Sequence, residues 1–305
     1  MFARGQGTDI MISQYRPCDS GGSMKLCRWG RSGYEQSGMI DAQGQLRDLS
    51  GIIEYIDQDT LSPRGLAKLR KIRPESLPMV KGTPRFGVPY TGISKIIGIG
   101  LNYRDHALET GSPLPTQPIL FLKATTSING PDDDVIQPRG SSMLDWEAEL
   151  GVVIGTKASY VTEAQALDHV AGYTIVNDVS ERSFQRATPQ WDKGKGFDTA
   201  GPIGPWLVTT DEIPNPQNLD IWLEVNGELM QDGNTRNMIF TAAQLVSHVS
   251  QYMTLLPGDI ISTGTPAGVG LGRKPVPVFL KPGDVMMLGI QGLGEQRQRV
   301  MASKP

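Results

Sequence analysis

The chain has 305 residues, of which 38% are apolar, and its formal net charge is −3. The small net charge without a basic cluster argues against a nucleic-acid-binding protein, and no apolar run approaches the roughly 20 residues that span a bilayer. The length is enough to bury a large core, as one domain or as one domain with a small companion. The two cysteines, Cys18 and Cys27, do not form a metal motif, so the composition predicts a cytoplasmic protein in a reducing compartment.

The first 23 residues are predicted to be a flexible leader. They lack apolar periodicity and end in Ser20-Gly21-Gly22-Ser23, which has the composition of a linker. They also lack the uninterrupted apolar segment of a signal peptide. We therefore expect the ordered chain to begin at Met24.

Residues 24–90 are predicted to form a small N-terminal α+β domain. Three short apolar runs predict strands, at 26–29, 37–40 and 46–49. Ser62-Pro63 predicts the start of a helix, because proline is favoured in a first helical turn. A connector that contains proline and glycine, residues 81–92, leads to the rest of the chain.

Residues 91–305 are predicted to form the main domain. Short runs rich in apolar residues predict strands at 96–100, 119–122, 145–154, 171–178, 219–226, 259–263 and 285–290. Helical periodicity is confined to 162–170 and 241–253. Many strands with scattered helices predict a strand-rich α+β fold, a mixed or antiparallel β-sandwich or roll rather than a regular βαβ repeat.

The first of these strands contains Gly98-Ile99-Gly100, which resembles the start of a dinucleotide-binding loop. The third glycine of that motif is replaced by Tyr103, and regular βαβ units are absent from the predicted elements. The sequence therefore argues against a dinucleotide site.

The segment after Gly100 contains a candidate acid–base pair. His106 and Glu109 are three residues apart, so on a short helix they share a face and can form a hydrogen bond. A carboxylate beside an imidazole orients the ring and raises its basicity, which suits a base that activates water. An ordinary ion pair on a surface helix is the alternative. Gly100 and Gly111 flank the segment and suggest a movable lid.

Two further acidic residues lie on the predicted strand 145–154. Alternate side chains of a strand leave the same face, so Glu147 and Glu149 point the same way. Two adjacent carboxylates in a strand built for burial repel each other and are costly to desolvate, and a bound divalent cation relieves both costs. A solvated acidic face on an edge strand is the alternative.

A third carboxylate, that of Asp178, ends the next apolar strand, 171–178. Oxygen ligands with few histidines or cysteines favour Mg²⁺, Mn²⁺ or Ca²⁺ over zinc. Three carboxylates leave about three octahedral positions for water or substrate, as in a catalytic metal site. The spacing alone does not bring Asp178 to the two glutamates.

Together these segments resemble the fumarylacetoacetate hydrolase superfamily. The resemblance spans roughly residues 91–300, and residues 24–92 resemble the small N-terminal domain of its longer bacterial members. Its motifs occur in the family's order: Gly100 to Glu109, Phe121-Leu122-Lys123, Asp145 to Leu150, Asn177-Asp178 and Ser262 to Gly270. The resemblance implies the β-sandwich roll of that family with a small N-terminal domain, 24–90, and a catalytic domain, 91–305.

The resemblance also implies roles for individual residues. It makes Glu147, Glu149 and Asp178 the ligands of Mg²⁺ or Mn²⁺, and it makes His106 and Glu109 the dyad that activates water. Lys195 matches the family's active-site lysine, with Lys193 as a competing candidate. Arg182, Gln190 and Thr265 match positions that bind the keto-acid end of the substrate. One departure is Gly196, where relatives often carry serine, which puts a minor hydrogen bond in doubt.

The activity implied is metal-dependent hydrolysis of a carbon–carbon bond in a 2,4-diketo acid. Within the family, the chain resembles the sugar-acid branch that cleaves 2,4-diketo-3-deoxy-rhamnonate or -fuconate to pyruvate and lactate, and a homodimer is expected. One alternative is decarboxylation of oxaloacetate, which needs the same chelation but no attacking water. Another is a non-catalytic binding module, which would be expected to lack a ligand or a base, and neither is missing.

Overall fold

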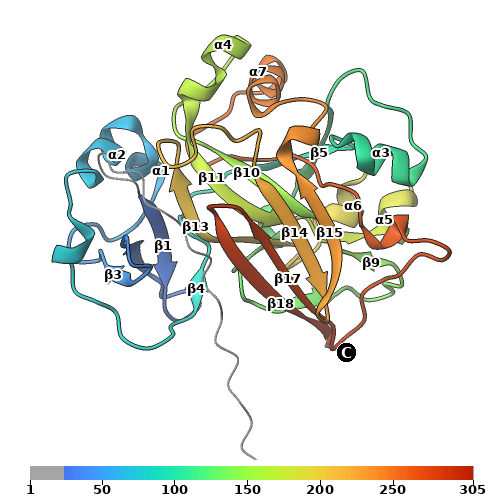
Figure 1. The fold of residues 1–305 in the computed structure, drawn as a ribbon, viewed down its shortest axis with the longest axis horizontal. Helices are drawn as coiled ribbons and strands as arrows, with labels where there is room; N and C mark the ends of the chain where they lie inside the picture. The colour runs from blue at the N-terminus through green and yellow to red at the C-terminus, as the bar shows by residue number, and fades with distance from the viewer. Residues whose placement is uncertain (1–23, 305) are drawn as a thin grey trace, which may run out of the picture.

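The computed structural model describes residues 24–304, so the predicted leader, 1–23, lies outside the described residues. The described chain forms a strand-rich α+β fold with two large sheets (Figure 1), which confirms the predicted fold class. In this part of the chain no helix has the length and apolar character needed to cross a membrane.

The larger sheet is built from eleven strands. Their bounds are β1 Lys25–Trp29, β2 Gln36–Ile40, β3 Leu46–Asp48, β4 Phe86–Gly87, β5 Ile96–Gly100, β6 Ile119–Lys123, β7 Ile128–Asn129, β10 Ala148–Ile154, β11 Val170–Asn177, β13 Gly201–Thr209 and β16 Ile260–Ser262. The continuous path runs β3-β2-β1-β13-β11-β10-β16-β5-β6, with β4 beside β1 and β7 beside β13. Because β16–β5 and β13–β7 are parallel and the other pairs antiparallel, the sheet is mixed.

A second sheet packs against the first. Its strands are β8 Val135–Gln137, β14 Asp220–Val225, β15 Glu228–Asn234, β17 Val285–Ile290 and β18 Gly294–Ala302, and their order is β15-β14-β17-β18-β8. A separate short pair joins β9 Leu144–Asp145 to β12 Ser180–Glu181. The two large sheets together form the β-sandwich, with β10 and β11 facing the second sheet.

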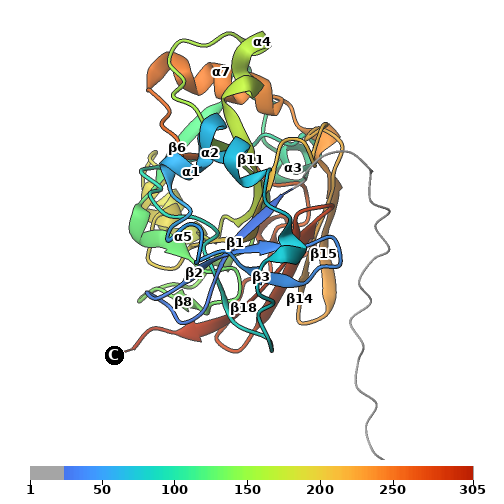
Figure 2. The same ribbon diagram turned by 90° about the vertical axis from the view of Figure 1, so that its left-hand side faces the viewer.

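The helices are short and lie around the sheets. Their bounds are α1 Gln58–Leu61, α2 Pro63–Leu69, α3 Arg104–Thr110, α4 Glu163–Ala166, α5 Arg182–Arg186, α6 Asp192–Lys195 and α7 Ala242–Tyr252, with 3₁₀ turns η1 Pro74–Ser76, η2 Thr125–Ser127, η3 Leu167–His169, η4 Thr235–Asn237 and η5 Gly270–Gly272. Helix α7 starts with a capping box in which Thr241 and Gln244 satisfy each other's backbone N–H groups. Helices α4 and α7 lie together on one side of the molecule in both views (Figures 1 and 2).

Strand β10 separates two hydrophobic cores, because successive side chains of a strand point to opposite faces. Leu150 and Val152 belong to the core between the two sheets. Val153 points to the other face and packs in a second core with Leu26 and Leu207. Both faces of β10 are therefore buried, which explains its nearly continuous apolar sequence.

The N-terminal segment is joined to the main sheet rather than to a sheet of its own. Strand β1 pairs with β13, with Leu26 opposite Leu207 (blue beside yellow in Figure 1). Arg85 adds ion pairs to Glu35, at 2.9 Å, and to Asp133. The division of the chain at residue 90 stays a prediction, and the two parts share a sheet and a core.

Most predicted elements are confirmed, and the strands that were missed are β4, β7, β8, β12, β13, β15 and β18. Strands β13 and β18 were not predicted, because β13 contains two Gly-Pro steps and β18 alternates charged and amide residues. Buried Gln296 and Gln298 take the inward positions that apolar residues would mark in the sequence. The prediction of one continuous strand at 145–154 is also wrong, because Trp146 and Glu147 lie between two separate strands, β9 and β10.

Candidate metal and catalytic site

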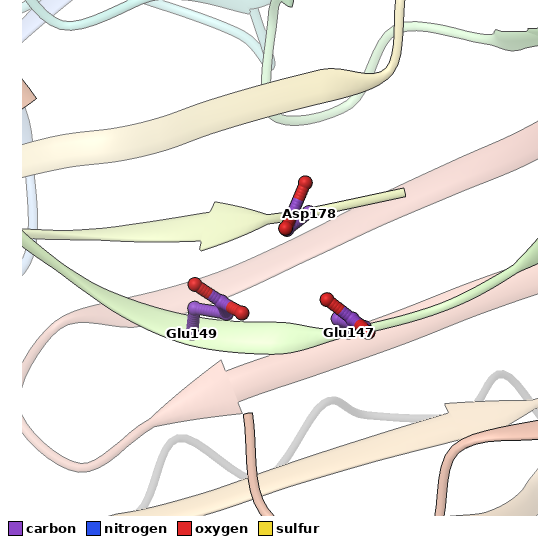
Figure 3. A group of neighbouring side chains, drawn as sticks. All are labelled: Glu147, Glu149 and Asp178. Carbon is purple, nitrogen blue, oxygen red and sulfur yellow. The ribbon is translucent and has the colours of Figure 1, made fainter. Parts of the chain in front are cut away.

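Three buried carboxylates meet where β10 and β11 lie side by side. Glu147 directly precedes β10, Glu149 lies within it, and Asp178 follows the last residue of β11, as Figure 3 shows. The backbone N–H of Asp178 donates to the carbonyl oxygen of Glu147 at 2.9 Å, which holds the two chain ends together. One oxygen from each carboxylate lies within 4.8 Å of the others. The antiparallel pairing of β10 and β11 thus brings together the three predicted ligands.

Buried cations surround two of these carboxylates. The Lys195 Nζ atom donates to Glu147, at 2.6 Å, and to Asp178, at 2.7 Å. Lys123 donates to the other Asp178 oxygen at 2.6 Å, and Arg182 donates to the other Glu147 oxygen at 2.6 Å. Burial by itself would raise the pKa of Glu147, but Lys195 and Arg182 together hold that pKa well below its ordinary value.

Glu149 differs from its two neighbours because no cationic side chain bonds to it in the described chain. Its Oε2 accepts hydrogen bonds from the Ser262 hydroxyl, at 2.6 Å, and from the backbone N–H of Gly264, at 3.0 Å. Burial first, and then the charges of Asp178 and Glu147, raise the pKa of Glu149 well above its ordinary value.

The residues present fit a divalent cation. Three carboxylates, those of Asp145, Glu147 and Asp178, are ion-paired with three cations, Lys123, Arg182 and Lys195, so the unpaired Glu149 leaves one carboxylate in excess. A cation at Glu149 would offset the excess negative charge and replace the missing partner. The hydroxyl of Tyr103 is also buried and has no partner among the described residues. Burial first, and then the charges of Glu149 and Asp105, raise the pKa of Tyr103 well above its ordinary value.

The predicted dyad lies on helix α3, and His106 lines a cavity that Glu147 and Glu149 also line. His106 is buried, and its Nδ1 lies 3.4 Å from Oε2 of Glu109. The carboxylate of Glu109 also accepts the backbone N–H of Gly268, at 2.9 and 3.1 Å to its two oxygens. Glu109 therefore joins α3 to the segment 264–272 and at the same time lies next to the imidazole.

The cavity has a volume of about 290 Å³. Its charged and polar lining includes Glu147 and Glu149 and two of the predicted catalytic residues, His106 and Lys195. The rings of Phe121 and Trp191 form an aromatic wall on the same cavity. The lining residues are Ile99, Gly100, Leu101, His106, Thr110, Ser112, Phe121, Glu147, Glu149, Arg182, Gln185, Arg186, Thr188, Trp191, Lys195, Thr265 and Leu271.

Gly98 and Gly100 make room for this aromatic wall. A Cβ atom at Gly98 would lie 2.1 Å from the ring of Phe121, and one at Gly100 would lie 2.2 Å from the ring of Trp191. The two rings pack against each other with centroids 5.8 Å apart. The Gly-x-Gly sequence thus provides a packing surface for two rings.

The structure distinguishes the two candidate lysines. Lys195 is buried, and its Nζ lies 4.9 Å from the centre of the Phe121 ring, whereas Lys193 is exposed and does not line the cavity. Lys123 was not predicted to belong to the site. Its signal in the sequence was its place two residues after Phe121, because both side chains leave the same face of β6.

The three predicted substrate-binding residues lie in different surroundings. Arg182 lines the cavity, and its guanidinium donates to Asp145, Glu147 and Gln185. Thr265 lines the cavity, donates to the Ala148 carbonyl at 2.8 Å and accepts from Gln231. Gln190 is exposed and lies outside the cavity lining, while Gln185, which was not predicted, is inside it.

Comparisons with known proteins agree with the fold. Residues 95–301 match the fumarylacetoacetate (FAA) hydrolase C-terminal family. A Burkholderia cenocepacia protein with a provisional hydrolase name is 60% identical over 277 residues, which cover 90% of this chain and 98% of that protein.

Two solved structures are also similar over nearly the whole chain. The fumarylacetoacetate hydrolase of Exiguobacterium antarcticum has a TM-score of 0.81 and 35% identity, covering 92% of this chain and 100% of that one. A 2-hydroxyhepta-2,4-diene-1,7-dioate isomerase from Mycobacterium marinum has a TM-score of 0.72 and 33% identity, covering 93% and 100%. The chain belongs to the fumarylacetoacetate hydrolase family, an enzyme family of hydrolases and isomerases.

Proposed function

We propose that this protein hydrolyses a carbon–carbon bond in a 2,4-diketo acid and releases pyruvate. The observation that supports this proposal best is that Glu147 and Glu149, two members of a buried carboxylate triad, line one cavity together with buried His106. A divalent cation bound by Glu147, Glu149 and Asp178 would supply a Lewis acid for the oxygens at the keto-acid end. Mg²⁺ and Mn²⁺ are the proposed ions, because all three ligands are carboxylates.

His106 is proposed to act as the base. Its Nδ1 faces Glu109 at 3.4 Å, so Nε2 is the nitrogen left to take a proton from water. Glu109 is held by the N–H of Gly268 and fixes the orientation of the ring. The buried position of His106 limits access of bulk water to the reacting atoms.

The proposed reaction adds one water molecule across the C3–C4 bond, and every bond that breaks is matched by one that forms. The water oxygen forms a bond to the C4 carbonyl carbon while His106 takes the proton, and the Lys195 ammonium stabilises the developing negative charge on oxygen. The C3–C4 bond then breaks, and its electron pair passes to C3 to give the enolate of pyruvate. Protonation of C3 completes pyruvate, and the former C4 becomes the carboxylate of the second product.

Within this class, we propose the diketo acids derived from rhamnonate or fuconate, which would give lactate as the second product. This choice rests on the sequence resemblance to the sugar-acid branch. The protein is further proposed to be a cytoplasmic homodimer, and Arg182, Gln190 and Thr265 are proposed to contact the substrate. Of these three, Arg182 and Thr265 line the cavity.

The test is a panel of 2,4-diketo acids given to the metal-loaded protein. Pyruvate release is followed with a coupled assay, and the second product is identified. Pyruvate in equal amount with a carboxylic acid supports the proposal. Carbon dioxide from oxaloacetate without diketo-acid cleavage, or isomerisation of a dienoate without cleavage, would contradict it.

A further inference from the structure

The cavity has a buried end and an exposed end. Glu147, Glu149, Lys195 and Thr265 form the buried end, where the proposed chemistry takes place. The exposed end is formed by polar side chains from the end of α3 and from α5 and the loop after it. These residues are Thr110, Ser112, Gln185, Arg186 and Thr188, of which Arg186 and Thr188 are exposed and the others half-buried.

The three cationic side chains of the cavity differ in their partners. Lys195 is held by Glu147 and Asp178. All three nitrogens of the Arg182 guanidinium donate to other side chains, which are Asp145, Gln185 and Glu147. The side chain of Arg186 makes no hydrogen bond or ion pair with any residue between 24 and 304. Arg186 is therefore the one cationic side chain of the cavity lining in the described chain whose N–H donors, five in all, are entirely without a partner.

Arg186 also lies at a suitable distance from the carboxylates. It is four residues after Arg182 on α5, so both side chains leave the same face, about 6 Å apart along the axis. Arg182 contacts Glu147 directly, at 2.6 Å. One helical turn therefore separates the buried end from the Arg186 position, a distance comparable with the length of a short acyl chain.

The rest of the cavity lining is largely apolar. Phe121, Trp191 and Leu271 form it together with Ile99 and Leu101. These side chains suit the carbon chain of a substrate but offer no hydrogen bonds to oxygen, apart from the indole N–H of Trp191. A polar tail is therefore matched by the polar side chains at the exposed end of the cavity.

We propose that Arg186 is a specificity-determining residue that binds an oxygen acceptor at the far end of the acyl group. The preferred substrates are 2,4-diketo acids whose acyl tail carries a carboxylate or a hydroxyl group, and the carboxylate is preferred because charge-assisted hydrogen bonds are stronger. Thr188 and Ser112 supply further hydroxyl groups at the same end. This inference rests on the proposed diketo-acid cleavage and names the part of the substrate that the sequence resemblance could only suggest.

The test compares three acylpyruvates that differ in the tail. Acetylpyruvate has no polar tail atom, a second acid carries a tail hydroxyl, and a third carries a terminal carboxylate. They are assayed with the wild type, Arg186→Leu and Arg186→Lys. Arg64→Leu is the matched control, because Arg64 is also an exposed helical arginine without a side-chain partner in the described chain but lies on α2, away from the cavity.

The expected result is a selective loss. In Arg186→Leu, kcat/KM should fall on the order of 10- to 100-fold for the carboxylate tail, mainly through KM, and about 5-fold for the hydroxyl tail. The loss for acetylpyruvate should be at least about 5-fold smaller than that for the carboxylate tail. Arg186→Lys should recover part of the carboxylate preference, since the charge remains, and Arg64→Leu should match the wild type.

Equal losses for all three acids, or none, would overturn the inference. If the wild type released no pyruvate from any acid, the proposed function would fail instead. Isothermal titration calorimetry with the same acids then measures binding without turnover and tests the role of Arg186 by itself. Tighter binding of the carboxylate acid by the wild type than by Arg186→Leu supports its role, and equal binding refutes it.

Discussion

At the scale of single residues, Glu149 distinguishes the proposed metal site from an ordinary ion-pair cluster. Glu147 and Asp178 each have buried cations at hydrogen-bond distance, and these partners offset the cost of burying their charges. Glu149 has a hydroxyl and a backbone N–H in their place. An unpaired buried carboxylate beside two others is costly in the absence of a cation.

Replacing this carboxylate tests the metal site without relying on turnover. We expect metal-free Glu149→Gln to withstand heat at least as well as metal-free wild type, because the repulsion is removed. Mg²⁺ or Mn²⁺ at about 100 times its dissociation constant should stabilise the wild type by about 2.7 kcal/mol, and this gain should be lost in the variant. Thermal unfolding with EDTA or metal measures both. Exposed Glu75→Gln is the control, and an unchanged metal effect in Glu149→Gln would contradict the assignment.

Replacing the proposed base should affect turnover far more than metal binding. In His106→Ala, kcat is expected to fall by on the order of 10²–10⁴, while the stabilisation by metal persists. Glu109→Gln should change kcat in the same direction but less, because the imidazole remains. His248→Ala is the control, since that ring packs on Tyr252 on α7. Near wild-type turnover in His106→Ala would instead favour the alternative that His106 and Glu109 form an ordinary ion pair on a surface helix.

At the scale of elements, α3 is held against the segment 264–272. Glu109 accepts the N–H of Gly268, and the side chain of Glu109 leaves no space for a Cβ atom at Gly272, whose Cβ would lie 2.2 Å from Cδ of Glu109. Asp145 fixes the same segment by accepting the N–H groups of Gly270 and Leu271. The position of the His106 ring therefore depends on a loop more than 150 residues further along the chain.

A methyl group at Gly272 should disturb this contact. The φ of Gly272 is not left-handed, so alanine fits the backbone, but its Cβ would displace the Glu109 carboxylate. In Gly272→Ala we expect kcat to fall by on the order of 10- to 100-fold, with a loss of stability below about 1 kcal/mol. Kinetics and thermal unfolding measure the two effects. Gly51→Ala, at a position where a Cβ meets nothing, is the control, and unchanged kinetics in Gly272→Ala would contradict the role of the contact.

At the scale of the whole molecule, the N-terminal segment completes the large sheet. Strand β1 covers the edge of β13, and Leu26 is buried in the core that also contains Val153 of β10. The strand that carries Glu149 is thus supported from one face by the N-terminal segment and from the other by the second sheet. Residues 24–90 are therefore expected to unfold together with the catalytic part.

This arrangement predicts different outcomes for two N-terminal deletions. Removal of residues 1–23 should leave a dimer that turns over substrate, because this stretch carries no apolar pattern with which to bury surface. Removal up to Gly30 should prevent folding, because it takes away β1 and exposes the edge of β13. Sedimentation and pyruvate release test both. A monomer or an inactive protein after the first deletion would contradict the predicted start of the ordered chain and the proposed dimer.

The sequence by itself determined the features that depend on local periodicity and residue type. Alternation along a strand placed Glu147 and Glu149 on one side. The next apolar run supplied Asp178 as a further oxygen ligand, and only the family resemblance joined it to the two glutamates. Helical spacing predicted the contact of His106 with Glu109. Short apolar runs gave most of the strands, and their number predicted the fold class.

Only the tertiary structure decided which partner each charged group has. Lys123 meets Asp178 across 55 residues, and Arg182 meets Asp145 and Glu147 across 37 and 35 residues. Such pairs depend on strand order and helix placement, about which local spacing carries no information. For the same reason the sequence could not separate Arg182, whose nitrogens are occupied, from Arg186, whose donors remain available. Strand β18 escaped prediction likewise, because its buried glutamines are satisfied by hydrogen bonds to distant backbone that exist only in the folded chain.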